Sequence, residues 1–488
     1  MSNLKEKTIN GVFWSFIQNF STQINAFIVG IILARLLSPR EFGLIGMLTI
    51  FIALSQTLVN SGLKDALIRK SNCNQVDYST AFFFNIAMSV FLYIALFFSA
   101  NIISDFYDEP KLVNLVRVLS FTLIINAFTL IQKARLIRDI NFKLITKVEV
   151  IASLLSGIIA IIMAYLGFGV WSLVAKTLLI SFFTVILFWF WSKWTPSLTF
   201  SRESFRELFS FGSKLALMGV IGTIFNNIYY LVIGKYYSAN QLGFYTKAEG
   251  FKDFPSKGIT NIVQKVTYPV LSKLKDDKEK LNRTYIKLFE TITFLCFTAL
   301  FGLSAISVDF TIVLLGEEWQ KAGEYLQLLC FVGIFYPLDA LNMNIMKVLG
   351  KSTAILNIGL LRRVLTIPVL IIGIYYGINE MIVALIVHQI ISYLIYSSYA
   401  GRFIEFGTLD QVKRVAPSVF MSGAMFFILM FLGEILEVRK VILVLIQIVS
   451  GIFFILLFSE LLKIKSYVYL KKTAREKLQN FKNKGGAE

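Results

Sequence analysis

The sequence predicts an all-α polytopic membrane protein with about fourteen transmembrane helices. The chain has 488 residues, of which 56% are hydrophobic, and its mean hydropathy is +0.69. Apolar runs recur along the whole length, and runs of about 20 residues can cross a hydrocarbon core about 30 Å thick. Backbone polar groups in lipid need internal partners, and the short alternating segments of a β-barrel are missing from this sequence. We therefore expect each run to be a helix.

The first apolar run continues to about residue 37 with no small-residue cleavage site, so it is expected to remain as an uncleaved first helix. The eighth, "FKDFPSKGITNIVQKVTYPV", is too polar to face lipid on all sides. The predicted spans are 11–36, 42–64, 79–104, 113–137, 144–166, 169–191, 208–233, 249–271, 285–308, 322–348, 353–376, 379–401, 415–433 and 440–462.

The net charge of +18 is explained by the tendency of Lys and Arg to collect in cytoplasmic loops, so it does not indicate a nucleic-acid partner. An even number of helices places both termini on one side. With that side inside, about thirty Lys and Arg are cytoplasmic and about eight are outside. The outer loops "SDFYDEP" and "LLGEEW" are acidic. The basic tail after residue 462 is expected to lie in water or along anionic membrane lipids.

A charged turn between apolar runs occurs twice, as "ARLLSPREFGLIG" (34–46) and "GKYYSANQLGFYT" (234–246). Ser38 and Ser238, and likewise Gly43 and Gly243, are 200 positions apart. We interpret each copy as a tight extracellular turn between the first and second helices of a repeated half. Pro39 ends a helix, and glycine permits close packing where the next helix begins.

A second pair of segments, "AYLGFGVWSL" (164–173) and "IYYGINEMIV" (374–383), extends the repeat at a spacing of 210. Because each half holds an even number of helices, the halves have the same orientation and form a parallel repeat. The predicted organisation is an N-terminal lobe of helices 1–6 (1–191), a cytoplasmic linker (192–207), a C-terminal lobe of helices 7–12 (208–402), helices 13–14 (403–462) and a basic cytoplasmic tail (463–488).

Polar side chains at helical spacing predict a substrate cavity between the two lobes, because polar residues at membrane depth usually face a cavity or the bundle interior. Two such stripes occupy equivalent places in the repeat, four residues apart on one face. They consist of Gln56, Asn60 and Lys64 in the second helix, and of Lys257, Asn261 and Lys265 in the eighth. The alternative is that these residues only pair with other polar groups between helices.

Further candidates lie in three other helices. Gln18 and Asn25 share a face of the first helix and suit hydrogen bonds to a sugar, although interhelical bonding is an equal alternative. Arg362 and Arg363 match phosphate geometry, or else extend to the membrane interface. The candidates for ion or proton coupling are the carboxylates at membrane depth, for which simple charge neutralisation is the alternative: Asp65, Glu149, Glu290 and Asp339.

No enzyme constellation is present in the sequence. It contains no nucleotide-binding motif, and its three cysteines have neither metal-ligand nor disulfide spacing. The single histidine, His388, is expected to be a packed polar residue. We therefore expect a protein that is not an enzyme and that has no cofactor and no metal.

Twelve helices in two halves, followed by two more, resemble the multidrug/oligosaccharidyl-lipid/polysaccharide exporter superfamily. The opening "NGVFWSFIQNFSTQINAFIVGIILARLLSPREFGLIGMLTIF" is similar to the polysaccharide transporter branch, the Wzx-type oligosaccharide flippases. "SPREFGLIGM" is the most specific part, "GLKDALIRK" also fits, and the resemblance covers about residues 5–460.

The resemblance implies a flippase in the bacterial cytoplasmic membrane for surface polysaccharide biosynthesis. It would move undecaprenyl-pyrophosphate-linked oligosaccharide to the outer leaflet by alternating access through a cationic central cavity, and its protein partners would include a polysaccharide polymerase and glycosyltransferases. The basic stripes agree with an anionic ligand. A peptidoglycan lipid II flippase remains an alternative. So does a multidrug/cation antiporter of the same fold, although binding cations calls for acidic cavity residues.

Overall fold

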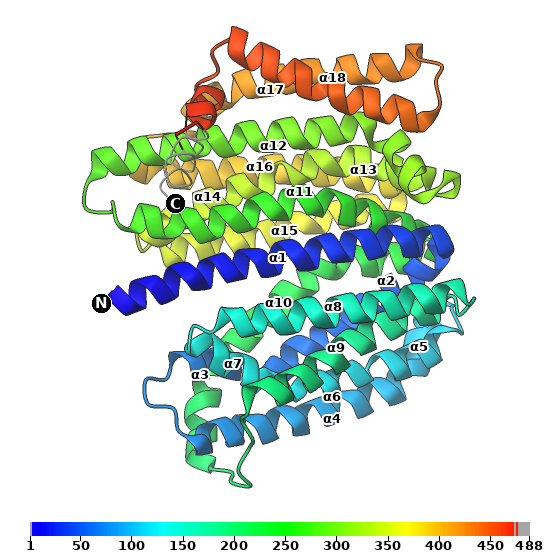
Figure 1. Ribbon diagram of the computed structural model, residues 1–488, viewed down its shortest axis with the longest axis vertical. Coiled ribbons are helices and arrows are strands. Elements are labelled where there is room, and N and C mark those ends of the chain that lie inside the picture. Colours follow the sequence, from blue (N-terminus) through cyan, green and yellow to red (C-terminus); the bar gives the residue numbers. More distant parts are fainter. Residues whose placement is uncertain (1, 473–474, 477–488) are drawn as a thin grey trace, which may run out of the picture. The chain divides into compact units, whose positions relative to one another are not determined.

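The computed structural model describes residues 2–472 and 475–476, and the regular elements within them are helices (Figure 1). In this part of the chain, twelve helices are long and apolar enough to cross a membrane, and a bent pair raises the number to thirteen. The predicted all-α polytopic class is therefore confirmed. The chain divides into two compact units, residues 1–246 and 247–488.

The first unit is built from long helices that pack as neighbours, including α1 with α8, α8 with α9, and α2 with α10. Its helices are α1 (Ser2–Leu36), α2 (Pro39–Asn60), α3 (Leu63–Arg69), α4 (Gln75–Tyr107), α5 (Leu112–Leu119), α6 (Phe121–Ala127), α7 (Leu130–Arg138), α8 (Phe142–Tyr165), α9 (Val170–Ser192) and α10 (Arg202–Tyr236). The first turns of α11 (Ala239–Ser272) also belong to this unit.

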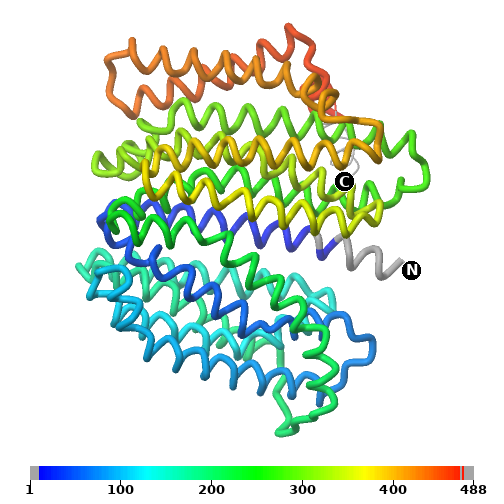
Figure 2. Tube along the Cα trace, turned by 180° about the vertical axis from the view of Figure 1, so that it is seen from behind, coloured from blue at the N-terminus to red at the C-terminus, as the bar shows by residue number. Residues whose placement is uncertain are grey.

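The second unit contains the rest of α11 and a bundle around α12, which packs against α13, α17 and α18 (Figure 2). Its other elements are α12 (Lys278–Leu315), η1 (Glu317–Trp319), α13 (Gln320–Gly333), α14 (Phe335–Val348), α15 (Ser352–Tyr375), α16 (Ile378–Ile404), α17 (Thr408–Ile435) and α18 (Lys440–Leu461). Residues 465–472 of the predicted basic tail are helical, whereas 473–474 and 477–488 lie outside the described residues.

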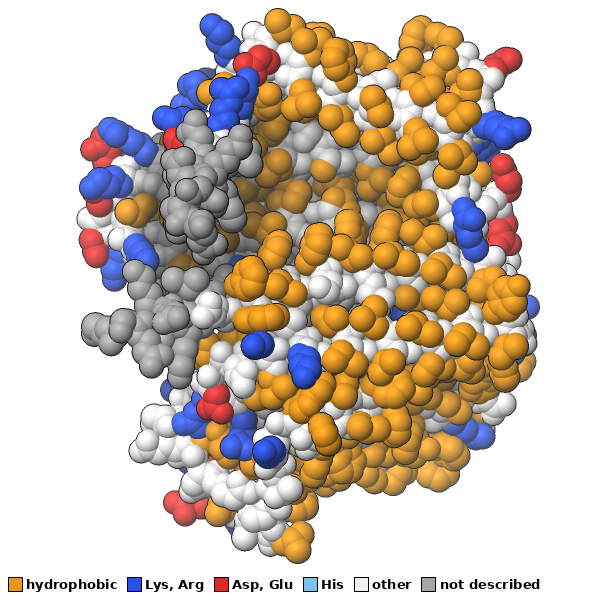
Figure 3. Space-filling view, viewed as in Figure 1, with side chains coloured by type: hydrophobic (Ala, Val, Ile, Leu, Met, Phe, Trp, Pro, Cys, Tyr) orange, Lys and Arg blue, Asp and Glu red, His pale blue; other side chains and the backbone are white. Residues whose placement is uncertain are grey.

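Apolar side chains cover the length of these helices on the face drawn in Figure 3, and charged side chains gather at the helix ends. Exposed large residues on α18 include Val449, Phe453 and Leu461. Such residues would be costly in water and are favourable in lipid, so this pattern supports spanning helices.

The predicted spans 113–137 and 322–348 are both interrupted. The span expected at 113–137 consists of α5, α6 and α7, with a bend of 41° before α7. At this bend the Thr129 hydroxyl donates to the carbonyl of Asn126 over 2.9 Å, which competes with the regular helical pattern. The span expected at 322–348 breaks at Ile334, between α13 and α14.

The predicted eighth span corresponds to α11, a single helix of 34 residues that contains Pro255 and Pro269. It is not among the helices apolar enough to be candidate spans. This agrees with the prediction that it is too polar to face lipid on all sides. The division between the two units falls within this helix, and α10 packs with α2, α3 and α4 in the first unit. The six-helix lobes derived from the repeat remain a prediction.

The two charged turns contact each other through their glycines. A Cβ atom on Gly43 would lie 1.7 Å from the Ala239 carbonyl oxygen, and one on Gly243 would lie 1.8 Å from the Pro39 carbonyl oxygen. Pro39 and Ala239 are the first residues of α2 and α11. Each helix start therefore packs directly on the backbone of the other, in a reciprocal arrangement that matches the sequence repeat. The close packing predicted for Gly43 is confirmed.

Charged residues of the two turns pair with the two acidic residues that follow the C-terminal end of α4. Arg40 forms an ion pair with Glu109 over 2.9 Å, and Lys235 lies 3.4 Å from Asp108. The Ser38 backbone N–H donates to the Glu41 carboxylate, which caps the start of α2. The Arg40 side chain is 52% exposed, so it keeps contact with water.

Candidate functional site

The polar stripe of the second predicted helix is not on one continuous helix. α2 ends at Asn60, and Ser61 and Gly62 have φ values of 43° and 65°, which turn the chain before α3. The prediction that Gln56, Asn60 and Lys64 share a helical face is therefore wrong for Lys64. At this break α10 packs directly against the backbone of Gly62. A Cβ on Gly62 would be 2.2 Å from the Gly212 carbonyl oxygen of α10. A continuous helix with a larger residue would not fit there.

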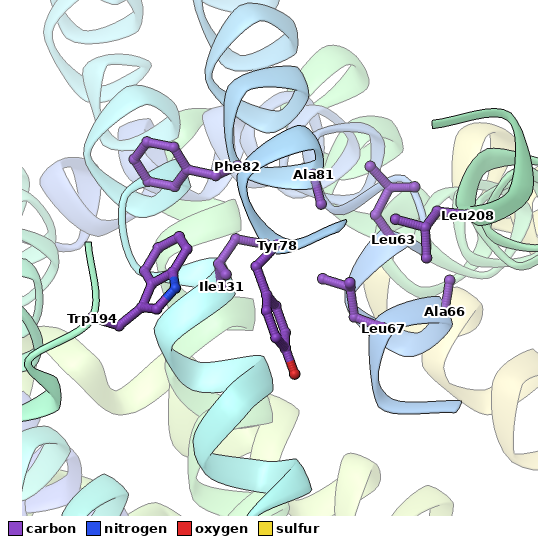
Figure 4. Packing of buried hydrophobic residues seen from close by; sticks show 9 residues of the cluster. All are labelled: Leu63, Ala66, Leu67, Tyr78, Ala81, Phe82, Ile131, Trp194 and Leu208. Carbon is purple, nitrogen blue, oxygen red and sulfur yellow. The ribbon is translucent and has the colours of Figure 1, made fainter. Parts of the chain in front are cut away.

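The short helix α3, which carries Lys64, is held in place by a hydrophobic cluster (Figure 4). Leu63 and Leu67 are almost completely buried in it. The cluster joins α3 to α4, α7, α10 and the segment after α9, and comprises Leu63, Ala66, Leu67, Tyr78, Ala81, Phe82, Ile131, Trp194 and Leu208. Lys64 is half-buried, so its position depends on this packing.

Lys64 belongs to a charged cluster in the first unit. Glu149 of α8 accepts hydrogen bonds from Lys133 of α7 and from Gln18 of α1. Lys64 interacts electrostatically with Lys133, Glu149 and its neighbour Asp65, which is exposed. Two cations and two carboxylates thus share one end of the first unit, and their formal charges balance. We name Gln18, Lys64, Asp65, Lys133 and Glu149 the first-unit polar cluster.

The remaining predicted amides of the first unit bond between helices. Asn25 donates to the Ser153 hydroxyl over 2.6 Å, and Asn126 donates to the Gln56 side-chain oxygen over 3.3 Å. Asn60 is half-buried at the end of α2. The interhelical alternative stated for these amides is therefore the observed arrangement for Asn25 and Gln56.

The stripe on α11 is continuous, as predicted. Lys257 forms an ion pair with Asp253 four residues earlier, while its side chain remains 59% exposed. Asn261 is half-buried and Lys265 is exposed. Asp253 thus neutralises part of the charge that the sequence assigned to this stripe.

A buried lysine on α11 was missed in the sequence. Lys252 is 1% exposed, lies 3.0 Å from Asp253 and 3.7 Å from Glu249, and is placed 4.9 Å from the centre of the Tyr336 ring. Two adjacent carboxylates compensate one buried cation, which such a site requires. The signal was available in "EGFKD", where acids flank a lysine.

Arg362 lies inside the second unit rather than at the membrane interface. Its guanidinium is 3.5 Å from the Asp339 carboxylate and donates to Gln389 over 3.0 Å. His388 contacts the Arg362 carbonyl oxygen over 3.1 Å and is buried, in agreement with the packed role expected for it. Arg363 is half-buried on the same helix.

Each buried or half-buried carboxylate proposed for ion coupling has a basic partner. Glu149 pairs with Lys133 and Asp339 with Arg362, while Glu290 accepts from Arg414 over 2.7 Å. The partner of Glu290 is thus Arg414, from α17, and not a neighbour in its own helix. Charge neutralisation, the stated alternative, describes all three. Among the residues that the structure describes, no group of three or more His, Cys, Asp or Glu is arranged to hold a metal ion.

Outside the spans, the loop after α3 is tied to two helices. Lys70 lies 2.8 Å from Glu207 of α10 and 3.0 Å from Asp77 of α4. The hydrogen bond to Glu207 raises the pKa of Lys70, with a further increase from Asp77. Burial raises the pKa of the nearby Cys73 thiol, which disfavours the reactive thiolate.

Comparison with known sequences identifies the family. A model of the family "Polysaccharide biosynthesis protein" matches residues 32–324, which is more than half of the chain. The chain belongs to this family. This family match, together with the two relatives described next, confirms the predicted membership of the polysaccharide transporter branch.

Two relatives cover most of the chain. Lipopolysaccharide biosynthesis protein WzxC of Escherichia coli (strain K12) is 25% identical over 373 residues, 76% of each chain. Succinoglycan biosynthesis transport protein ExoT of Rhizobium meliloti (strain 1021) is 26% identical over 444 residues, 88% of each chain. The names of these two relatives refer to different polysaccharides.

The fold of this family member is similar to that of a solved transporter. The structure of lipid II flippase MurJ in an inward closed conformation aligns with a TM-score of 0.76 at 17% identity, covering 92% of this chain and 98% of that one. At this identity the likeness shows the fold alone. It agrees with the predicted polytopic helical class.

Proposed function

We propose that this protein is a flippase for an undecaprenyl-pyrophosphate-linked oligosaccharide in surface polysaccharide biosynthesis. The observation that carries the proposal is the first-unit polar cluster, in which two half-buried lysines lie beside an amide and a carboxylate at the end of spanning helices. Ionisable residues in such positions are usually functional. The names of WzxC and ExoT, which refer to lipopolysaccharide biosynthesis and succinoglycan transport, support the same class of cargo.

The chemistry of the cluster suits an anionic head group that carries sugars. Glu149 is the internal partner of Lys133, and a pyrophosphate is an anion that can take its place. Gln18 supplies an amide for a sugar hydroxyl or a phosphate oxygen. In this proposal the head group exchanges with the carboxylate, so the balanced charge of the empty cluster limits the cost of burying it. Lys265 of α11, which is equivalent to Lys64 in the sequence repeat, is our candidate for the matching cation of the alternating-access cavity that the resemblance implies.

Two other activities compete with this proposal. A peptidoglycan lipid II flippase would use the same pyrophosphate chemistry with a different sugar. A multidrug/cation antiporter needs acidic groups that are free to bind a cation, whereas Glu149, Glu290 and Asp339 are each paired with a basic residue. These pairings favour an anionic cargo, and they make the carboxylates weaker candidates for ion coupling.

The test is a flipping assay with purified protein in liposomes. The cargo is an undecaprenyl-pyrophosphate-linked oligosaccharide with a fluorescent sugar that a membrane-impermeant reductant bleaches in the outer leaflet. We expect the bleached fraction to rise from about half to nearly all when flipping equilibrates the leaflets. The comparison cargoes are lipid II and an organic cation. Preference for lipid II, or transport of the organic cation alone, would contradict the proposal.

We further propose that the protein lies in the bacterial cytoplasmic membrane with both termini and residues 192–207 in the cytoplasm, where a polymerase and glycosyltransferases would be its partners. The support is the Lys and Arg bias of the loops. The test uses Lys275→Cys and Glu318→Cys, each in a background with Cys73, Cys296 and Cys330 replaced by serine. In intact cells an impermeant maleimide should label the cysteine at 318 and leave that at 275 unlabelled until permeabilisation. The reverse pattern would overturn the orientation.

A further inference from the structure

A pocket of about 640 Å³ lies in the second unit between α17 and the end of α18. α18 is an apolar candidate span that stops at Leu461, and the pocket is lined by the residues just after this point together with residues between 413 and 424 of α17. This places it at the boundary between the hydrocarbon core and water. The location does not depend on which side of the membrane that end faces.

The chain after α18 is built into the pocket wall. Lys463 adopts a left-handed conformation with φ of 47°, and the Ile464 N–H donates to the Ser459 carbonyl over 3.0 Å. Ile464 is 9% exposed and packs against Phe294 and Met421. The turn is thereby fixed against α12 and α17, so the side chains on either side of it have defined positions.

The charged side of the pocket is strongly basic. It is lined by the cations Lys413, Arg414, Lys463 and Lys465. The acid in this lining, Glu290, is already bonded to Arg414 over 2.7 Å. The three lysines are exposed and have no ion-pair partner among the residues that the structure describes. The pocket therefore carries an excess of positive charge at a membrane boundary.

Several other lining residues of the pocket are apolar. Phe420 of α17 is 77% exposed, and Phe458 of α18 is 36% exposed. Both line the pocket together with Phe454 and Met421. Aromatic and apolar surface next to unpaired cations fits an amphiphile whose anionic head meets the lysines and whose acyl chain lies on the rings. A free phosphate ion would use the lysines but not this wall.

We propose that this pocket binds an acidic phospholipid, with its phosphodiester at Lys463 and Lys465 and an acyl chain along Phe420 and Phe458. Bound there, the lipid joins the start of α17 to the end of α18. This site is distinct from the first-unit polar cluster, and its occupation does not require that the protein be a flippase. Its ligand is a bilayer lipid and not the cargo.

The test measures lipid binding to the full chain in detergent by native mass spectrometry and by the shift in thermal unfolding temperature. The probes are phosphatidylglycerol and phosphatidylcholine with identical acyl chains. In Lys463→Gln/Lys465→Gln we expect phosphatidylglycerol to bind about thirtyfold more weakly, since each basic residue near an anionic head group contributes roughly a factor of five. The control is Lys273→Gln/Lys275→Gln, which removes the same charge from an exposed loop and should leave binding unchanged.

Further outcomes decide between occupants. Phe420→Ser should weaken phosphatidylglycerol binding and leave that of inorganic phosphate unaffected. Equal binding of phosphatidylglycerol and phosphatidylcholine, or equal losses in the two lysine variants, would overturn the site. Displacement by inorganic phosphate at similar concentration would show an anion site rather than a lipid site. Tighter binding of undecaprenyl phosphate than of phosphatidylglycerol would assign the pocket to the cargo and contradict the proposal.

Discussion

Replacing Lys64 with alanine is expected to lower cargo flipping per folded molecule by about tenfold or more. A charge-assisted hydrogen bond contributes about 1.5–3 kcal/mol, and a tenfold change in binding corresponds to about 1.4 kcal/mol. Lys64 is half-buried beside Lys133 and Glu149, where an anionic head group would gain this interaction. Lys265→Ala is expected to act in the same direction if α11 provides the matching cation. The measurement is flipping in liposomes, normalised to folded protein.

Variants of graded charge separate a binding role from a packing role for Lys64. Lys64→Arg should retain more activity than Lys64→Gln, because the positive charge is the requirement. Lys133→Ala should also reduce flipping, but with a loss of stability, since it leaves Glu149 without its basic partner. Lys275→Ala, in an exposed loop, is the matched control and should have normal activity. Full activity of the Lys64→Ala/Lys265→Ala double variant, at normal protein level, would remove both residues from the cargo site.

Replacing Gly43 or Gly243 with alanine is expected to cause a large loss of folded protein. The added Cβ would lie 1.7 Å from Ala239 in one case and 1.8 Å from Pro39 in the other, and both obstacles are backbone oxygens that cannot rotate away. The starts of α2 and α11 would have to separate, at a cost of about 3 kcal/mol or more. The measurement is the amount of monodisperse protein extracted from membranes, together with its unfolding temperature.

Two glycines in long helices provide the controls, and one of them shares α11 with Gly243. Alanine at Gly222 of α10 or at Gly250 of α11 would meet no atom within 4 Å, so it should be neutral or slightly stabilising. The Gly43→Ala/Gly243→Ala double variant should lose less than the sum of the single variants, because one separation relieves both clashes. Normal abundance with lost flipping would contradict the packing role and move the charged turns into the cargo path.

The sequence alone was sufficient for the class of fold and for the repeated turns. Long apolar runs leave the backbone no alternative to helix in lipid, so the helices were predictable, although α11 and α12 extend beyond their predicted bounds. The spacing between Gly43 and Gly243 indicated equivalent packing positions, and the structure places their helix starts in direct contact. The polar character of α11 was equally visible, since too few of its residues can face lipid.

Tertiary structure alone decided which polar residues meet. Ser61 and Gly62 break the helix before Lys64 because α10 approaches at Gly212, and no periodicity within α2 reports a neighbour 150 residues later. The pairings of Glu149 with Lys133 and of Glu290 with Arg414 join separate helices, so spacing along one helix could not reveal them. Helical periodicity determines the face on which a charge lies, whereas the partner on the facing helix depends on how the helices pack.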